Sequence, residues 1–307
     1  MSERSVCLVS GSSSGIGEAT VRNFARNGYN VVINYNSGRD KAELIAEQIQ
    51  TKYNVTALCV GADLSQRDEP FRLVDKTISH FGRLDVVISN SGVVNYLKDE
   101  HDQLQRFRFH ECPPEHLDGE MERVIDLNLI GAYRLAQRAL SYMIETAASE
   151  RTLEQNPSHR SILFITSISD VAPESTRIPY GVSKAALNHA VLGAALEGGK
   201  YNITVNALRP GVIDTPLTRR PSGLFDPDSG KEFTVADTYD LMAQGGAQVI
   251  PRIGTPEDVA EAAYAFVHMP FMTGQLIAID GGLTLPSAFA NRELFLNEGL
   301  KKRQKSA

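Results

Sequence analysis

Tryptophan is absent from the 307 residues, and cysteine occurs only three times, at Cys7, Cys59 and Cys112. So few cysteines at irregular spacing exclude a disulfide scaffold and favour a reducing compartment, so we expect a cytoplasmic protein. Basic residues are also scarce, because 37 aspartates and glutamates outnumber 31 lysines and arginines. The resulting net charge of −6 argues against a protein that binds nucleic acid through its phosphates.

Long hydrophobic runs are missing as well. The N-terminal residues include Glu3 and lead directly into a short apolar run, which does not fit a secretory signal peptide. Residues 262–279 were the stretch most worth testing as a membrane span, but His268, Pro270 and Gly274 interrupt it. We therefore expect no membrane span. Hydrophobic residues make up 42% and charged residues 22%, values typical of a folded globular chain.

Short β-branched runs alternate with amphipathic stretches along most of the chain. Strands are expected at 5–10, 30–35, 55–61, 85–89, 160–166, 203–208 and 275–279, and the helices between them include 40–53, 66–81, 115–145 and 178–198. Strands that are apolar throughout and separated by helices indicate βαβ units and a parallel sheet covered on both faces. The sequence predicts an α/β fold, a doubly wound, seven-stranded parallel sheet of the Rossmann type. It forms one domain, residues 1–282, followed by a C-terminal extension, 283–307.

Three segments interrupt this alternation. Residues 93–120 are long and densely charged, residues 146–158 are polar, and residues 222–234 contain glycine, proline and aspartate without periodicity. The first is interpreted as an inserted loop near the edge where the strands end, and no regular element is assigned to the last. Residues 301–305 are mostly basic and are expected to be solvated.

A glycine loop joins the first expected strand to the first helix. It reads Gly11-Ser12-Ser13-Ser14-Gly15-Ile16-Gly17, a GxxxGxG spacing. A pyrophosphate needs backbone N–H groups at a helix N-terminus and no side chains in the way, and glycines at this turn supply both. The alternative is a helix-initiating turn that binds nothing, but the position between strand and helix favours a nucleotide.

A second motif places a phenol beside an ammonium group. Tyr180 is followed four residues later by Lys184, so on a helix both side chains lie on one face. Ser167 lies thirteen residues before Tyr180, at the end of an expected strand. Taken alone, the Tyr-Lys pair could be a surface tyrosine beside a solvated lysine.

These motifs, in this order, resemble those of the short-chain dehydrogenase/reductase family, in its single-domain members such as 3-oxoacyl reductases and glucose 1-dehydrogenases. The resemblance covers about residues 5–282 and includes the glycine loop, Asp63-Leu64, Asn90-Ser91-Gly92, Asn128 in Asp126-Leu127-Asn128-Leu129-Ile130-Gly131, Ser167, Tyr180 with Lys184, and Pro210-Gly211-Val212-Ile213-Asp214-Thr215. The chain departs from the family at Ser89 and Ser91, where the family has Asn and Ala.

The resemblance implies an oxidoreductase that moves hydride between a nicotinamide cofactor and a carbonyl or secondary alcohol. Tyr180 would be the general acid/base, with its phenol pKa lowered from about 10 by Lys184 and the positive nicotinamide ring. Ser167 would hydrogen-bond the substrate oxygen, and Lys184 would also hold the nicotinamide ribose. Asn128 would hold a water that relays protons to Lys184.

The same resemblance implies the cofactor contacts. They are Gly11, Ser13, Ser14, Gly15, Ile16, Gly17, Tyr35, Asn36, Ser37, Arg39, Asp63, Leu64, Asn90, Ser91, Gly92, Tyr180, Lys184, Pro210, Gly211, Ile213 and Thr215.

The end of the second strand favours NADP over NAD. NAD-binding folds usually carry an acid there to hold both ribose hydroxyls, and this chain has Tyr35. Arg39, with Asn36 and Ser37, would receive the 2′-phosphate instead. Because no basic residue stands within the glycine loop, an NAD-dependent sugar or polyol dehydrogenase that uses the same site remains the alternative. A non-catalytic nucleotide-sensing protein is a second alternative, which the intact catalytic set argues against.

Partners and further sites follow from the same comparison. The resemblance implies a homotetramer or homodimer, formed through helices 115–145 and 178–198, and a substrate lid at about 215–250. We expect a small carbonyl or alcohol as substrate. A zinc site at His101, His110, Cys112 and His116 is the competing interpretation of the insert, but the spacing lacks a second ligand pair, so no metal is expected.

Overall fold

The computed structural model describes residues 4–94, 97–98, 104–105, 107–108, 110–152, 159–174 and 176–285. Most of the predicted C-terminal extension therefore lies outside the described residues.

The centre of the molecule is a seven-stranded sheet in the order β11-β8-β7-β4-β1-β2-β3. All six neighbouring pairs are parallel. The strands are β1 Val6–Val9, β2 Asn30–Tyr35, β3 Ala57–Gly61, β4 Val86–Ser89, β7 Arg160–Ile165, β8 Ile203–Pro210 and β11 Leu276–Ile279. The predicted doubly wound sheet is confirmed, and its strand order reverses between β1 and β4, where such folds open a ligand crevice.

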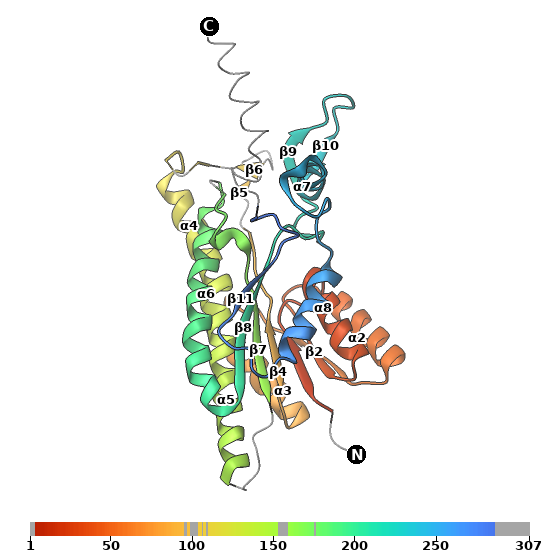
Figure 1. Ribbon diagram of the computed structural model, residues 1–307, viewed down its shortest axis with the longest axis vertical. Helices are drawn as coiled ribbons and strands as arrows, with labels where there is room; N and C mark the ends of the chain where they lie inside the picture. Colours follow the sequence, from red (N-terminus) through yellow and green to blue (C-terminus); the bar gives the residue numbers. More distant parts are fainter. Residues whose placement is uncertain are drawn as a thin grey trace.

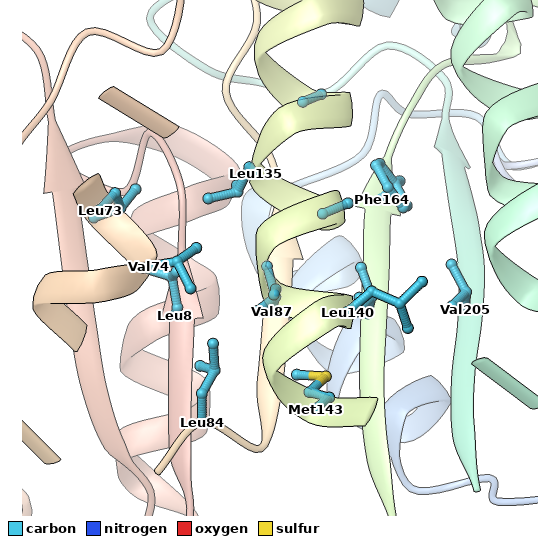
Figure 2. Packing of buried hydrophobic residues seen from close by; sticks show 14 of the residues in the cluster. Leu8, Leu73, Val74, Leu84, Val87, Leu135, Leu140, Met143, Phe164 and Val205 are labelled. Atoms are coloured by element: carbon cyan, nitrogen blue, oxygen red, sulfur yellow. The ribbon is translucent and has the colours of Figure 1, made fainter. Parts of the chain in front are cut away.

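Helices cover both faces of the sheet (Figure 1). One face packs against α1 Gly15–Arg26, α2 Arg39–Tyr53 and α8 Pro256–Val267, and the other against α3 Glu69–Phe81, α5 Ala132–Thr152 and α6 Ile178–Gly198. Figure 2 shows the second of these cores, where Leu73, Leu135 and Met143 meet strand residues such as Leu8 and Phe164. Each such large apolar side chain contributes about 1.5–3 kcal/mol by leaving water. Central strands are buried on both faces, which explains why their sequences are mostly apolar.

The helix before α5 is interrupted near the site. α4 Pro114–Ile125 passes through a π-helical turn, Asp126–Gly131, into α5. A Cβ at Gly131 would lie 2.2 Å from the Leu64 carbonyl oxygen, so glycine allows the turn to approach the loop after β3. The predicted helix 115–145 is therefore two helices and a π turn, and the π turn carries Asn128.

The segment 222–234 is regular, so the absence of an assigned element there was wrong. β9 Pro221–Phe225 and β10 Glu232–Thr234 form an antiparallel hairpin, followed by α7 Val235–Met242. The turn is closed by the Asp226 carboxylate, which accepts hydrogen bonds from the backbone N–H groups of Asp228 and Ser229. Thr234 caps α7 in a reciprocal pair with Asp237. Hairpin and helix stand above the carboxyl ends of the strands (Figure 1).

Other elements are short. β5 Leu97–Lys98 pairs with β6 Leu104–Gln105 inside the predicted insert, and single helical turns occupy Ile168–Asp170, Gly199–Tyr201 and Ala243–Ala247. The polar segment 146–158 begins as helix, because α5 runs to Thr152, and residues 153–158 lie outside the described residues. Within the described part of the chain, no helix combines the length and apolar character needed to cross a membrane.

Candidate active site

A cleft of about 810 Å³ opens at the carboxyl ends of the strands. Its lining combines the glycine loop, the residues that follow β2, β3, β4, β7 and β8, and residues of α7. Most of the predicted contacts line it: Gly11, Ser13, Ser14, Gly15, Ile16, Tyr35, Asn36, Ser37, Asp63, Leu64, Asn90, Ser91, Gly92, Ser167, Tyr180, Lys184, Pro210, Gly211, Ile213 and Thr215. Gly17, Arg39 and Asn128 do not belong to the lining.

The glycine loop has no room for side chains where it turns into α1. Gly11 and Gly15 have φ values of +60° and +56°, a region that L side chains rarely adopt. Gly17 lies behind the loop, and a Cβ there would sit 2.4 Å from the Gly11 carbonyl oxygen. Ser14 precedes α1 without a capping bond from its side chain, and it lines the cleft together with Gly15 and Ile16 in the first turn of the helix. Such a turn can receive a phosphate.

Two asparagines, the buried Asn34 and the half-buried Asn90, hold this loop in place. Asn34, inside β2, accepts a hydrogen bond from the Gly11 N–H at 2.9 Å. Asn90, after β4, donates from its side-chain amide to the Ser10 carbonyl oxygen at 2.9 Å. The Ser10 hydroxyl in turn accepts from the backbone N–H groups of Asn90 and Ser91. The sequence analysis did not single out Asn34, although a polar residue within an apolar strand was a visible signal.

The end of β2 carries no acid but does carry a cation that sequence reasoning missed. Tyr35, Asn36 and Ser37 line the cleft together with Lys41, in the first turn of α2. Arg39 points elsewhere, because its guanidinium bonds Glu43 at 2.7 Å and its side chain is 72% exposed. Lys41, not Arg39, is therefore the basic residue in this part of the lining.

Ser167 and Tyr180 reach the cleft from two neighbouring elements. Ser167 follows β7 and is nearly buried, and its hydroxyl accepts from the Ser169 N–H at 3.1 Å and donates to the Ser169 hydroxyl at 3.0 Å. Tyr180 lies in the first turn of α6, one turn before Lys184. The Lys184 Nζ is 5.6 Å from the centre of the Tyr180 ring, so serine, phenol and ammonium share one wall of the cleft.

Lys184 is almost wholly buried, with 3% of its surface exposed. Its Nζ donates to the Ile165 carbonyl oxygen at 3.2 Å. Burial disfavours the charged form and lowers the pKa of Lys184 from the usual 10.5 to about 8. A lysine with this pKa can hold or release a proton near neutral pH.

Asn128 lies behind the lining, fully buried in the π turn. Its side chain clamps one backbone residue, because Oδ1 accepts from the Val93 N–H at 2.8 Å and Nδ2 donates to the Val93 carbonyl at 2.9 Å. A Cβ at Gly92 would lie 3.2 Å from Asn128 Oδ1 and 3.4 Å from Lys184 Nζ. The amide and the ammonium thus converge on Gly92.

The cleft lining also includes two charged residues that follow β7 and a tyrosine of α7. Tyr239 donates its hydroxyl to Glu174 at 3.3 Å, and Glu174 also pairs with Arg177 at 3.2 Å. All three line the cleft. Sequence patterns gave no reason to name them, since they belong to no motif.

The zinc alternative named four ligands, and two of them fall outside the described side chains. Within the described part of the chain, no group of three His, Cys, Asp or Glu side chains could hold a metal ion. His101 lies outside the described residues, as does the side chain of His116.

Comparison with known proteins agrees with this geometry. Residues 11–284 match the family model described as enoyl-(acyl carrier protein) reductase. The chain is 31% identical to versicolorin reductase 1 of Aspergillus parasiticus over 281 residues, covering 90% of this chain and 95% of the relative. It is 30% identical to glucose 1-dehydrogenase 2 of Bacillus subtilis over 283 residues, covering 91% and 94%. A 3-oxoacyl-[acyl-carrier protein] reductase from Brucella melitensis, solved in complex with NAD, superposes with a TM-score of 0.75 at 26% identity, covering 94% and 100%.

The fold and cleft define an NAD(P)-dependent oxidoreductase that acts on CH–OH groups. The chain belongs to the short-chain dehydrogenase/reductase family, as the motifs predicted.

Proposed function

We propose that this protein reduces a carbonyl, or oxidises a secondary alcohol, with Tyr180 as general acid/base and NADP(H) as the preferred cofactor. The observation that carries the proposal is that Ser167, Tyr180 and Lys184 line the same cleft as the glycine loop. Two features make the loop suitable for a dinucleotide. Gly17 has no space for a side chain, because it packs against the Gly11 carbonyl oxygen and the Asn90 amide, and the N-terminus of α1 can bind a pyrophosphate.

Bound in this cleft, the nicotinamide would exchange hydride with the substrate. Ser167 donates a hydrogen bond to the substrate oxygen, which fixes the carbonyl and stabilises the charge that develops on it. Tyr180 gives its phenolic proton to that oxygen during reduction and takes it back during oxidation. Lys184 stands 5.6 Å from the phenol ring, and its cation favours the phenolate. Asn128 fixes the Val93 backbone beside Lys184 and would position a water for proton exchange.

Lys41 supports the preference for NADP. Its position in the lining next to Asn36 and Ser37 would put an ammonium group beside a 2′-phosphate. No carboxylate at the end of β2 opposes a phosphate there, since Tyr35 occupies that position. NAD-dependent oxidation of a sugar or polyol is the second candidate, favoured by the likeness to glucose 1-dehydrogenase 2.

The test follows reduced-cofactor absorbance with NADPH and NADH against ketones, 3-oxoacyl thioesters and sugars. We expect turnover that is faster with NADPH and is lost in Tyr180→Phe. Turnover only with NADH would favour the second candidate. Cofactor binding without turnover of any substrate would contradict the enzymatic proposal and favour a nucleotide-sensing role.

We further propose that two or four copies associate through the outer face of α5 and α6. Apolar side chains stand exposed along this face: Tyr133 is 51% exposed, Val182 45% and Leu196 77%. An exposed apolar face of this kind is typical of an association surface. Sedimentation of the wild type and of Leu196→Lys tests this, and a wild-type monomer would contradict it.

A further inference from the structure

Behind the cleft, one carboxylate joins three elements that carry the proposed active site. Asp170 closes the short turn after Ser167, and its Oδ2 accepts a hydrogen bond from Arg209 on β8 at 3.0 Å. The same oxygen accepts from the Asn188 amide on α6 at 2.8 Å. None of the motifs that define the family site includes these three residues.

Each of the three residues in this contact is close in sequence to a different part of the proposed active site. Asp170 stands three residues after Ser167 and shares its turn. Arg209 is followed immediately by Pro210 and Gly211 in the cleft lining. Asn188 is one helical turn beyond Lys184 and two beyond Tyr180, on the same side of α6. A shift of Asp170 would therefore displace Ser167, the loop after β8 and the helix that carries Tyr180 and Lys184 at the same time.

The hydrogen-bonding capacity of these three side chains is only partly used, which is unfavourable for a purely structural ion pair. The Asp170 side chain is 8% exposed and the Arg209 side chain 19%. Even so, Asp170 Oδ1, Asn188 Oδ1 and Arg209 Nε are buried and have no hydrogen-bond partner among the described residues. Each such atom costs free energy, so selection for stability alone would favour a better-satisfied or an apolar contact.

A second buried aspartate provides a built-in reference. The Asp85 side chain is also 8% exposed and pairs with Arg83 at 2.8 Å, but at the opposite end of the sheet. Both of its oxygens are bonded, Oδ1 to Arg83 and Oδ2 to Arg83 and the Val6 N–H. Neither Arg83 nor Val6, the partners of its carboxylate, lines the cleft.

We propose that Asp170, with Arg209 and Asn188, is a positioning residue that sets the distance between the Ser167 loop, the Pro210-Gly211 loop and the Tyr180-Lys184 helix. This inference rests on the proposed function. Proton transfer and hydride transfer both depend on the serine, the phenol and the loop being held in register. A displacement on the order of 1 Å can slow such a step about a hundredfold.

The experiment compares Asp170→Asn with Asp85→Asn in the full chain. Both substitutions keep the size of the side chain and remove its charge. For Asp170→Asn we expect kcat to fall about 30- to 100-fold, with KM for the cofactor changed no more than about twofold. With cofactor deuterated at the transferred position, the isotope effect on kcat should rise towards its full value, because hydride transfer becomes rate-limiting. Asp85→Asn should lower the melting temperature and leave kcat and the isotope effect within about twofold of wild type.

Asn188→Ala provides a second variant in case Asp170→Asn folds poorly. It removes only the arm to α6 and leaves the ion pair intact, and we expect kcat to fall about tenfold with a raised isotope effect. If both Asp170→Asn and Asn188→Ala keep the wild-type kcat and isotope effect, whatever their melting temperatures, the inference is overturned and the proposed function stands. Absence of turnover in the wild type would overturn the proposed function, and the inference with it.

Discussion

Each end of the central sheet packs an aspartate side chain against an arginine, but the two carboxylates differ in how many of their oxygens are hydrogen-bonded. At the amino end, Asp85 has both carboxylate oxygens bonded, whereas at the carboxyl end Asp170 Oδ1 has no hydrogen-bond partner among the described residues. The carboxyl end also buries the Lys184 ammonium, at a cost visible in its lowered pKa. The amino end is therefore arranged for stability, and polar groups that folding alone would not favour are concentrated where the cleft opens.

This contrast predicts that changes at the carboxyl end affect turnover and those at the amino end affect stability. Tyr180→Phe should give the largest loss, with kcat about a thousandfold lower, equivalent to about 4 kcal/mol of barrier. In the proposed mechanism the phenolic hydroxyl carries the transferred proton, and phenylalanine removes only that hydroxyl and keeps the ring. Steady-state kinetics, unfolding curves and cofactor titration together check the prediction. A drop in stability or cofactor affinity as large as the drop in kcat would show that the phenol serves structure instead.

The buried Lys184 ammonium should leave a signature in the pH dependence of stability without cofactor. Its folded-state pKa of about 8 lies below the usual 10.5, so from about pH 8 to 10.5 the unfolded chain holds a proton that the folded chain has released. Stability from this group therefore rises with pH across that window, by about 3 kcal/mol at 1.36 kcal/mol for each pKa unit.

Lys184→Met removes the titrating group and keeps most of its length. Relative to the variant, the wild type should gain this stability between pH 7 and pH 10.5 in urea unfolding experiments. A stability difference between the two proteins that does not change with pH would mean that Lys184 is solvated in the folded state.

Gly17→Ala should damage the cleft through backbone crowding. Its Cβ would lie 2.4 Å from the Gly11 carbonyl oxygen and 2.7 Å from Asn90 Nδ2, so the loop has to move. We expect the free energy of unfolding to fall by about 1–3 kcal/mol. We also expect the affinity for the cofactor to fall about a hundredfold. Calorimetry of cofactor binding measures the second effect. Gly119→Ala in α4 is the control, because nothing lies within 4 Å of its Cβ and helix propensity makes it neutral or stabilising.

The sheet could be predicted from the sequence because its central strands are buried on both faces and are therefore mostly apolar, with few polar residues such as Asn34 in β2 and Asn206 in β8. The helix start at Thr255 could be predicted as well, since Thr255 and Asp258 form the reciprocal cap that their spacing indicates. The hairpin at 221–234 could not, because Leu224 and Phe225 are exposed and the strands lack an alternating pattern. What fixes it is a local turn at Asp226, which composition does not reveal.

In the candidate site, most residues that belong to sequence motifs line the cleft, whereas residues joined only by tertiary contact were not predicted. Ser167, Tyr180 and Lys184 lie where strand ends and helical spacing put them. Asp170 and Arg209 are 39 residues apart and meet only because β7 and β8 are neighbours in the sheet. The sequence analysis predicted Arg39 as the phosphate ligand and did not consider Lys41, because the sequence does not show which side chain in the first turn of α2 faces the cleft.

The smallest expected effects concern cofactor binding by two neighbouring cations, Lys41 and Arg39. Lys41 lines the cleft, whereas the Arg39 side chain is 72% exposed and bonded to Glu43. Lys41→Ala should weaken NADPH binding about tenfold, about 1.4 kcal/mol, because one ammonium–phosphate contact is lost, and leave NADH binding unchanged. Arg39→Ala should change neither affinity by more than about twofold, since it removes only an exposed ion pair. Dissociation constants of both cofactors for both variants decide the matter: if Arg39→Ala instead weakens NADPH selectively, the 2′-phosphate lies on the outer side of α2 and the assignment of Lys41 is wrong.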